Sequence, residues 1–160
     1  ELGGVDLGEG PGLGWLEKRH KVSFKAAPIY KLGAFVDTME VATTYDNLHR
    51  LYQRVMTALS PLAVTMAHFS HAYATGCSIY FTFSAKLEDP YELEKRYDEV
   101  WRTAMSTVAE TGGILSHHHG IGLSKRDRMV DEIGAGVEVI RKLKQVLDPH
   151  GILNPGKLIP

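Results

Sequence analysis

The segment LAVTMAHFSHAYATGCSIYFTFSA (residues 62–85) decides the fold. Its second half, CSIYFTFSA (77–85), alternates apolar and small polar side chains, which is the pattern of a β-strand with one buried face. Its first half (62–71) also reads as a strand, and the short connection AYATG contains Gly76. Two strands so close along the chain predict an antiparallel hairpin.

Helical and extended patterns flank this hairpin on both sides. FVDTMEVAT (35–43) alternates like a strand, and apolar residues at helical spacing follow it until Pro61. After the hairpin, Asp89 and Pro90 provide an N-cap and a first helical residue, so a second helix should run to the glycine pair at 112–113.

Beyond these glycines, ILSHHH (114–119) predicts a fourth strand that pairs beside the first. Ser124 and Asp127 then begin a long C-terminal helix. The order β-α-β-β-α-β, followed by this helix and an extended tail, matches the ferredoxin-like arrangement. We therefore expect an α+β fold in which an antiparallel sheet carries helices on one face.

The domain organisation follows from the same patterns. Residues 35–148 should form the domain, the glycine-rich region 1–34 a connecting arm, and residues 149–160 a turn-rich tail. The first fourteen residues carry no apolar period and read as a loop.

One face of the predicted sheet stays uncovered, so another domain, another subunit or a ligand should cover it. Alternation directs Cys77, Ile79, Phe81 and Phe83 toward the helices and leaves Tyr80 on the open face. A strand tyrosine is most often a packing residue, so a role in chemistry depends on its meeting the histidines across the sheet.

Composition excludes several classes of protein. The chain has 160 residues, 44% of them hydrophobic, and a formal net charge of −1, so neither nucleic acid nor an anionic membrane is expected as a general partner. A single cysteine excludes an internal disulfide and favours a cytoplasmic setting. No apolar run approaches the length of a membrane helix.

The run His117, His118 and His119 allows three interpretations: a metal site, an acid/base or anion-binding site, or an exposed cluster without function. In a strand, His117 and His119 would face one side and His118 the other, so all three could not reach one ion, although two could join a distant carboxylate or His71. We therefore expect no metal. The following GIG offers backbone N–H groups before a helix start, which favours an acid/base or anion-binding site.

Three stretches in this order carry a resemblance: CSIYFTF (77–83), GGILSHHHGIGLSKRDRM (112–129) and LDPHGILNPGKLI (147–159). They resemble the C-terminal domain of FAD-linked oxidases of the vanillyl-alcohol oxidase type, and within that group the alkyldihydroxyacetonephosphate synthases (alkylglycerone-phosphate synthases). GEGPGLGWLEKR (8–19) and VDTMEVATTYDNL (36–48) have counterparts there too, so the resemblance spans nearly the whole chain.

The resemblance implies FAD, bound mainly by an N-terminal domain of the same protein that lies outside this chain, with the present domain as a cap on the substrate side. It implies exchange of the acyl group of acyl-dihydroxyacetone phosphate for a long-chain alcohol, an ether-lipid reaction without net redox change. The chain alone should be inactive. We also expect a lipid-like substrate, association with the periphery of a membrane, and a homodimer.

The same resemblance implies roles for individual residues. Tyr80 would donate and accept protons, and the catalytic histidine run would fall on His117, His118 and His119. The remaining expected contacts are Asn154 with the cofactor and Lys25, His71 and Tyr73 with the substrate.

Departures from the family pattern keep two alternatives open. The synthases have a substrate-binding arginine where Ala26 stands, and the neighbouring Lys25 lacks the bidentate geometry of arginine. FAD-linked 2-hydroxyacid dehydrogenases share GILNPGK, but their cap strand carries His-x-Gly-Asp-Gly-Asn-x-His, absent here, and His118 replaces their glutamate. The alternatives are an FAD-linked oxidase or dehydrogenase of a 2-hydroxy acid or alcohol, and a non-enzymatic ferredoxin-like interaction module.

Overall fold

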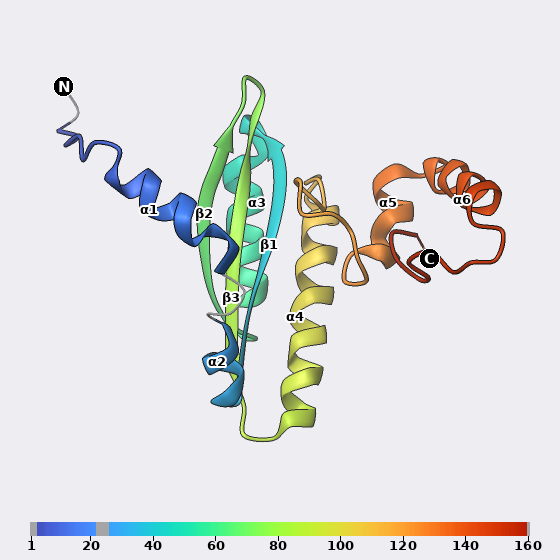
Figure 1. The fold of residues 1–160 in the computed structure, drawn as a ribbon, viewed down its shortest axis with the longest axis horizontal. Coiled ribbons are helices and arrows are strands. Elements are labelled where there is room, and N and C mark those ends of the chain that lie inside the picture. Colours follow the sequence, from blue (N-terminus) through green and yellow to red (C-terminus); the bar gives the residue numbers. More distant parts are fainter. Residues whose placement is uncertain (1–2, 22–25, 160) are drawn as a thin grey trace.

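A computed structural model describes residues 3–21 and 26–159. Among these residues, all three strands lie within the first 110 positions together with five helical segments, and only helical segments follow (Figure 1). In chain order the elements are α1 (Gly10–Lys18), η1 (Arg19–Lys21), α2 (Ala27–Lys31), β1 (Ala34–Thr44), α3 (Tyr45–Leu59), β2 (Val64–Ala72), β3 (Gly76–Lys86), α4 (Pro90–Glu110), η3 (Arg126–Arg128), α5 (Met129–Ile133) and α6 (Gly136–Leu147).

The sheet of the described residues has three antiparallel strands in the order β1-β3-β2. The predicted hairpin is confirmed as the pair β2 and β3, and the α+β class with an antiparallel sheet is confirmed. Because β3 is central, Tyr80 lies between Glu40 of β1 and His68 of β2 in the register. Directly opposite residues of antiparallel strands point to the same face, so these side chains share the open face.

Helices α3 and α4 lie side by side against the other face and contact both β1 and β3. The residues that alternation directed toward the helices are buried there: Ile79, Phe81 and Phe83 have no exposed surface, and Cys77 is buried as well. Met39 and Val41 of β1 complete this layer. The predicted split of β3 into an apolar face and an open face is therefore confirmed.

The ends of α4 also follow the sequence. The Asp89 carboxylate accepts hydrogen bonds from the backbone N–H groups of Tyr91 and Glu92 at 2.8 and 3.2 Å. Gly112, with φ of 75°, ends the helix in the left-handed conformation that favours glycine. At Gly76, glycine is required for a different reason. A Cβ there would collide with the carbonyl oxygen of Thr43, where β1 and β3 approach closely.

The predicted fourth strand is wrong in its extent. Residues 114–119 lie beside β1 as expected, but they form only one bridge, in which Ile114 and Ala42 exchange backbone hydrogen bonds. One further bond joins the His117 N–H to the Glu40 carbonyl at 3.1 Å. His118 has φ of 46°, which no strand accommodates, so the segment turns away from β1.

The predicted long C-terminal helix is also wrong, because it is interrupted. The 3₁₀ turn η3 and the short helix α5 end at Gly134, whose φ of 52° and ψ of −123° are accessible only to glycine, and α6 starts two residues later. Ser124 lies in a turn and caps no helix. Met129, Val137 and Ile159 pack into a small separate core under these helices.

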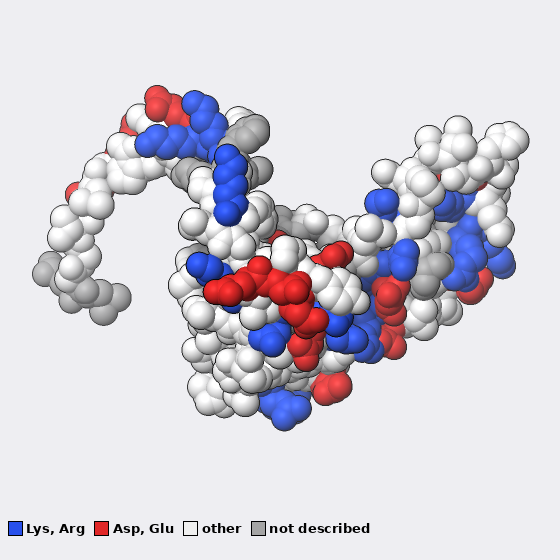
Figure 2. Space-filling model, turned by 90° about the horizontal axis from the view of Figure 1, so that it is seen from below, with Lys and Arg blue, Asp and Glu red and all other residues white. Residues whose placement is uncertain are grey.

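The N-terminal region is more helical than expected. Residues 10–18, partly predicted as loop, form α1, which buries none of its residues. Figure 2 shows the N-terminal arm and the C-terminal helices projecting on opposite sides of the sheet and its two helices, with a group of acidic side chains near the centre of this face and basic side chains beside it. Within the described part of the chain, no helix combines the length and apolar character needed to cross a bilayer.

Candidate functional site

The site is built around Glu40, a carboxylate in the middle of β1. Its strand neighbours Met39 and Val41 face the helices, so Glu40 faces the open side of the sheet. It is nevertheless only 1% exposed, because side chains from three other segments cover it. A carboxylate can remain this buried only when its oxygens have partners.

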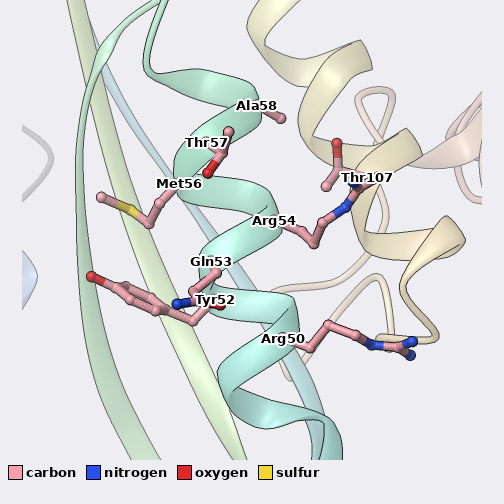
Figure 3. A pocket seen from close by; sticks show the side chains of 8 residues that line it. All are labelled: Arg50, Tyr52, Gln53, Arg54, Met56, Thr57, Ala58 and Thr107. Carbon is pink, nitrogen blue, oxygen red and sulfur yellow. The ribbon is translucent and has the colours of Figure 1, made fainter.

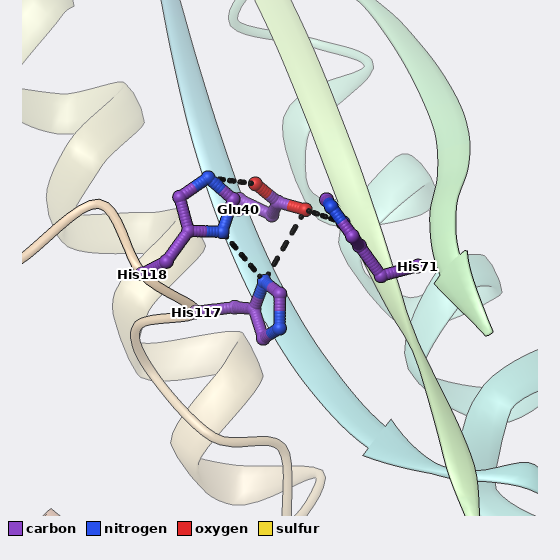
Figure 4. Close-up of side chains that lie close together, drawn as sticks. All are labelled: Glu40, His71, His117 and His118. Carbon is purple, nitrogen blue, oxygen red and sulfur yellow. Dashed lines mark hydrogen bonds and ion pairs between the residues drawn. The ribbon is translucent and has the colours of Figure 1, made fainter. Parts of the chain in front are cut away.

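Strands β2 and β3 supply the first two partners. The Ser78 hydroxyl donates a hydrogen bond of 2.8 Å to Glu40 Oε1 and accepts one from the His71 backbone N–H at 3.1 Å. The His71 ring places Nδ1 at 3.2 Å from Glu40 Oε1 (Figure 4).

All three histidines of the run turn toward the same carboxylate. His117 Nδ1 lies 3.4 Å from Glu40 Oε1, and the Nε2 atoms of His118 and His119 lie 3.4 and 3.2 Å from Oε2. The sequence predicted that His118 would face the opposite side from its neighbours. That prediction is wrong, because it assumed a strand, whereas the left-handed backbone at His118 rotates its side chain back into the cluster.

Two tyrosines extend the cluster. The Tyr73 hydroxyl lies 2.9 Å from His117 Nε2, which leaves Nδ1 of that ring directed at Glu40. The half-buried Tyr80 ring meets the His119 ring edge to face at 5.4 Å between centroids. The structure therefore brings together six of the predicted site residues: His71, Tyr73, Tyr80, His117, His118 and His119.

Burial and polar contacts have opposite effects on the pKa values of the groups in this cluster. Burial raises the pKa of Glu40, but the Ser78 hydrogen bond and the imidazoles of His118, His71 and His119 outweigh it and leave the pKa below its usual value. Burial lowers the pKa of His119; the Glu40 charge acts in the opposite direction without restoring the usual value. Glu40 is therefore ionised at neutral pH.

A buried lysine lies under the histidine loop. Lys125 is 4% exposed, and its Nζ donates to Ser116 Oγ at 3.0 Å. The Ser116 hydroxyl in turn donates to the Gly120 carbonyl at 2.7 Å, which closes the loop around the three histidines. Burial lowers the pKa of Lys125, and Glu40 and Asp37 partly counteract this effect.

One expected contact, Asn154, is not part of this cluster, and another falls outside the described residues. Asn154 lies in the C-terminal tail, where its φ is 45° and its carbonyl accepts from the Lys157 N–H at 3.4 Å. The tail meets the region after the histidines through the Leu158 N–H and the Gly122 carbonyl. Lys25 lies outside the described residues.

Two cavities differ in their relation to the cluster. One of about 720 Å³ lies on the helix side, lined by α3 and by Thr107 of α4, and none of the predicted site residues lines it (Figure 3). Another, of about 330 Å³, lies beside the cluster and is lined by Tyr73 and His117 together with Thr43 and Ile114. The smaller cavity is the one relevant to the site.

Sequence reasoning missed Glu40, Ser78 and Lys125. A signal for Glu40 was present: it is an acidic residue between Met39 and Val41 in a strand whose alternate residues are apolar. Once β1 and β3 are paired, the register places it directly opposite Tyr80. Ser78 shares that face of β3, two residues before Tyr80.

Comparisons with known proteins find matches over most of the chain. The family model described as "FAD linked oxidases, C-terminal domain" matches residues 16–158. Alkyldihydroxyacetonephosphate synthase of Dictyostelium discoideum is 32% identical over 96% of this chain and 26% of its own length, and that of Trypanosoma brucei brucei is 33% identical over 99% and 27%.

A solved structure of an alkyldihydroxyacetonephosphate synthase superposes with a TM-score of 0.62 and 26% identity, over 95% of this chain and 25% of that one. The chain thus spans about a quarter of the length of these relatives. With a match over most of its length and a shared fold, the chain belongs to the C-terminal domain family of the FAD-linked oxidases.

Proposed function

We propose that this chain is the substrate-side domain of an FAD-dependent enzyme that exchanges the acyl group of acyl-dihydroxyacetone phosphate for a long-chain alcohol. The observation that carries the proposal is the contact between Tyr80 and His119 on the open face, with the His119 imidazole held on the buried Glu40 carboxylate. Similarity to two synthases over nearly the whole chain supports this substrate class.

The exchange requires one proton to be moved by the protein. The alcohol O–H bond breaks as its oxygen bonds to the substrate carbon, and the acyl group leaves as a carboxylate. A phenol and a neutral imidazole in contact can take up that proton and pass it to solvent. Tyr80 and His119 would do this, while His117 and His118 stabilise charge near the head group.

The residues present fit contact with the reactive ring of a flavin. The uncovered sheet face offers flat aromatic surfaces and hydrogen-bond donors from Tyr80 and His119. When bound, FAD supplies an electron sink and source at the substrate carbon. The described residues include no glycine-rich strand-to-helix turn of the kind that cradles nucleotide phosphates, so an N-terminal domain of the same protein would hold that end.

A second candidate is an FAD-linked oxidase or dehydrogenase of a 2-hydroxy acid or alcohol. It is favoured by Ala26, which stands at the start of α2 where the synthases have a substrate-binding arginine. An alanine offers a phosphate no charge, so the head group would need another cation or a different substrate. We place either activity in the cytoplasm, at or near a membrane surface where the lipid substrate resides.

The test uses the full-length, flavin-loaded protein with acyl-dihydroxyacetone phosphate and an ¹⁸O-labelled long-chain alcohol. The proposal predicts an ether product that retains the label, with no lasting loss of flavin absorbance. In parallel, 2-hydroxy acids and alcohols are added singly under anaerobic conditions. Bleaching of the flavin by one of them, without ether product in the first assay, would reject the exchange reaction and establish the second candidate.

A further inference from the structure

We propose that Glu40, His71, His117 and His118 form a binding site for one divalent ion of the zinc class. One ligand atom from each residue can be chosen so that all four lie within 4.8 Å of one another (Figure 4). The sequence argued against a metal because strand residues cannot converge. The structure removes that premise, since the three histidines do not form a strand.

Two of the distances in the cluster are close to the edges of a coordination tetrahedron. With bonds of about 2.0–2.2 Å to nitrogen and oxygen, ligand atoms around zinc lie about 3.3–3.6 Å apart. Glu40 Oε1 lies 3.2 Å from His71 Nδ1 and 3.4 Å from His117 Nδ1. The Nδ1 atoms of His117 and His118 are 2.9 Å apart, closer than such an edge, so these two rings would move apart as an ion binds.

The charge balance of the cluster favours a cation. Glu40 is a buried carboxylate whose ion-pair partners among the described residues are all imidazoles, with no lysine or arginine among them. A bound dication would balance the charge of this carboxylate directly. The ion would also bind both of the facing Nδ1 atoms of His117 and His118. Without an ion, the lone pairs of these two atoms repel each other unless a proton lies between them.

A second layer of contacts orients these ligands. Ser78 donates to Glu40 Oε1, and the Tyr73 hydroxyl engages Nε2 of His117, which directs the Nδ1 lone pair inward. Such outer contacts accompany most metal-binding histidines and carboxylates. The backbone at His118 adopts a strained left-handed conformation that brings its ring into the set.

The donor set selects the kind of ion. Three imidazole nitrogens and one carboxylate oxygen suit Zn²⁺ and similar late transition ions, whereas Mg²⁺ and Ca²⁺ require mainly oxygen. The side chains of His71 and His118 are 48% and 54% exposed, which gives an ion access from the open face. Tyr80 and His119, the residues proposed to transfer the proton, lie outside the set, whereas His117 and His118 belong to it, so a bound ion would take over the charge stabilisation proposed for these two rings.

The test is a titration of the chelator-treated protein with ZnCl₂ by isothermal calorimetry, with bound metal counted by mass spectrometry after gel filtration. One Zn²⁺ per chain is expected, unaffected by excess Mg²⁺. His71→Gln and Glu40→Gln should each weaken binding at least about 100-fold, and Tyr73→Phe about 10- to 100-fold. His49→Gln, at an exposed position on α3, is the matched control and should bind like the wild type.

His71→Gln keeps the test valid if the buried Glu40 variant fails to fold, because His71 is half exposed. X-ray absorption of the zinc-loaded protein should show three imidazole ligands. Retention of no zinc after gel filtration would overturn the inference. So would binding that His71→Gln leaves unchanged, or that His49→Gln weakens equally, because it would then reflect scattered surface histidines.

Discussion

The two faces of the sheet are made from alternate residues of the same strands, yet they are organised by different forces. On the helix face, Met39, Phe81 and their neighbours are fully buried and contact one another through apolar surface. On the open face, Glu40 and Tyr80 stand opposite each other among imidazoles and hydroxyl groups. The apolar core and the polar cluster thus lie on opposite sides of the same strands and are made by residues one position apart.

The sharpest test of this separation is Tyr80→Phe in the full-length, flavin-loaded protein. The variant keeps the ring that contacts His119 and removes only the hydroxyl group. We expect the rate of ether formation to fall by about 10²- to 10⁴-fold, the usual contribution of a positioned proton donor. The urea midpoint of unfolding should not change.

The control for this variant is Tyr91→Phe, at an exposed position on α4. It should leave both rate and stability unchanged. An unchanged rate in Tyr80→Phe would contradict the assignment of chemistry to the open face.

The adjacent substitution, Phe81→Ala, should have the opposite profile. Phe81 has no exposed surface, so truncation leaves a cavity between the sheet and the helices. We expect the free energy of unfolding to fall by about 3–5 kcal/mol in urea titrations followed by circular dichroism. Val64→Ala on the exposed part of β2 should cost less than about 0.5 kcal/mol.

The rate per folded molecule should be unaffected in Phe81→Ala. A stability loss below about 1 kcal/mol would mean that the helix face is not close-packed, and the contrast between the faces would fail.

A smaller effect is expected at Asp37, a polar residue of β1 on the helix face. Its Oδ2 accepts hydrogen bonds from the Tyr97 hydroxyl at 2.7 Å and the Trp101 indole N–H at 3.1 Å. Asp37→Ala leaves both donors without this acceptor and should destabilise the fold by about 1–3 kcal/mol, measured by urea unfolding.

Asp98 is an exposed carboxylate on the same helix as Tyr97. The variant Asp98→Ala tests whether loss of a negative charge alone lowers the free energy of unfolding. Equal losses in the two variants would show that the hydrogen bonds at Asp37 contribute nothing specific.

The smallest effect concerns alkaline pH. Burial, and then the Asp37 hydrogen bond and charge, raise the pKa of Tyr97 above the ordinary 10.0. The unfolded chain therefore loses the Tyr97 proton at a lower pH than the folded chain does. The contribution of Tyr97 to the free energy of unfolding is complete below pH 10.0 and declines as the pH rises above 10.0. Tyr97→Phe should remove this part of the decline.

The measurement is the urea midpoint of wild type and Tyr97→Phe at a series of pH values on both sides of 10.0. The difference between the two proteins should shrink as the pH rises. A constant difference would locate the alkaline sensitivity elsewhere.

Local signals predicted much of the fold. The Asp89 cap, the glycines that end α4 and the alternation in β3 act within a few residues, so they can be read from sequence. The interruption at Gly134 was missed because apolar spacing continues across it, and one left-handed glycine is enough to break a helix.

The site was only half predictable for a different reason. The histidine run and Tyr80 were apparent as residues, but their convergence depends on the backbone at His118, which departs from the alternation of a strand. Glu40 gained its role from the pairing of β1 with β3 and from burial by β2 and the histidine loop. These contacts join segments that are distant in the sequence, so a local sequence pattern does not predict them.

The single bridge between Ile114 and Ala42 has a consequence for how such proteins can diversify. A residue inserted into a strand would shift every later side chain to the opposite face. A loop fastened to the edge of β1 by few backbone bonds can change length while the sheet keeps its register. Variation here would alter which imidazoles reach Glu40 and leave the framework intact, so specificity can evolve separately from folding.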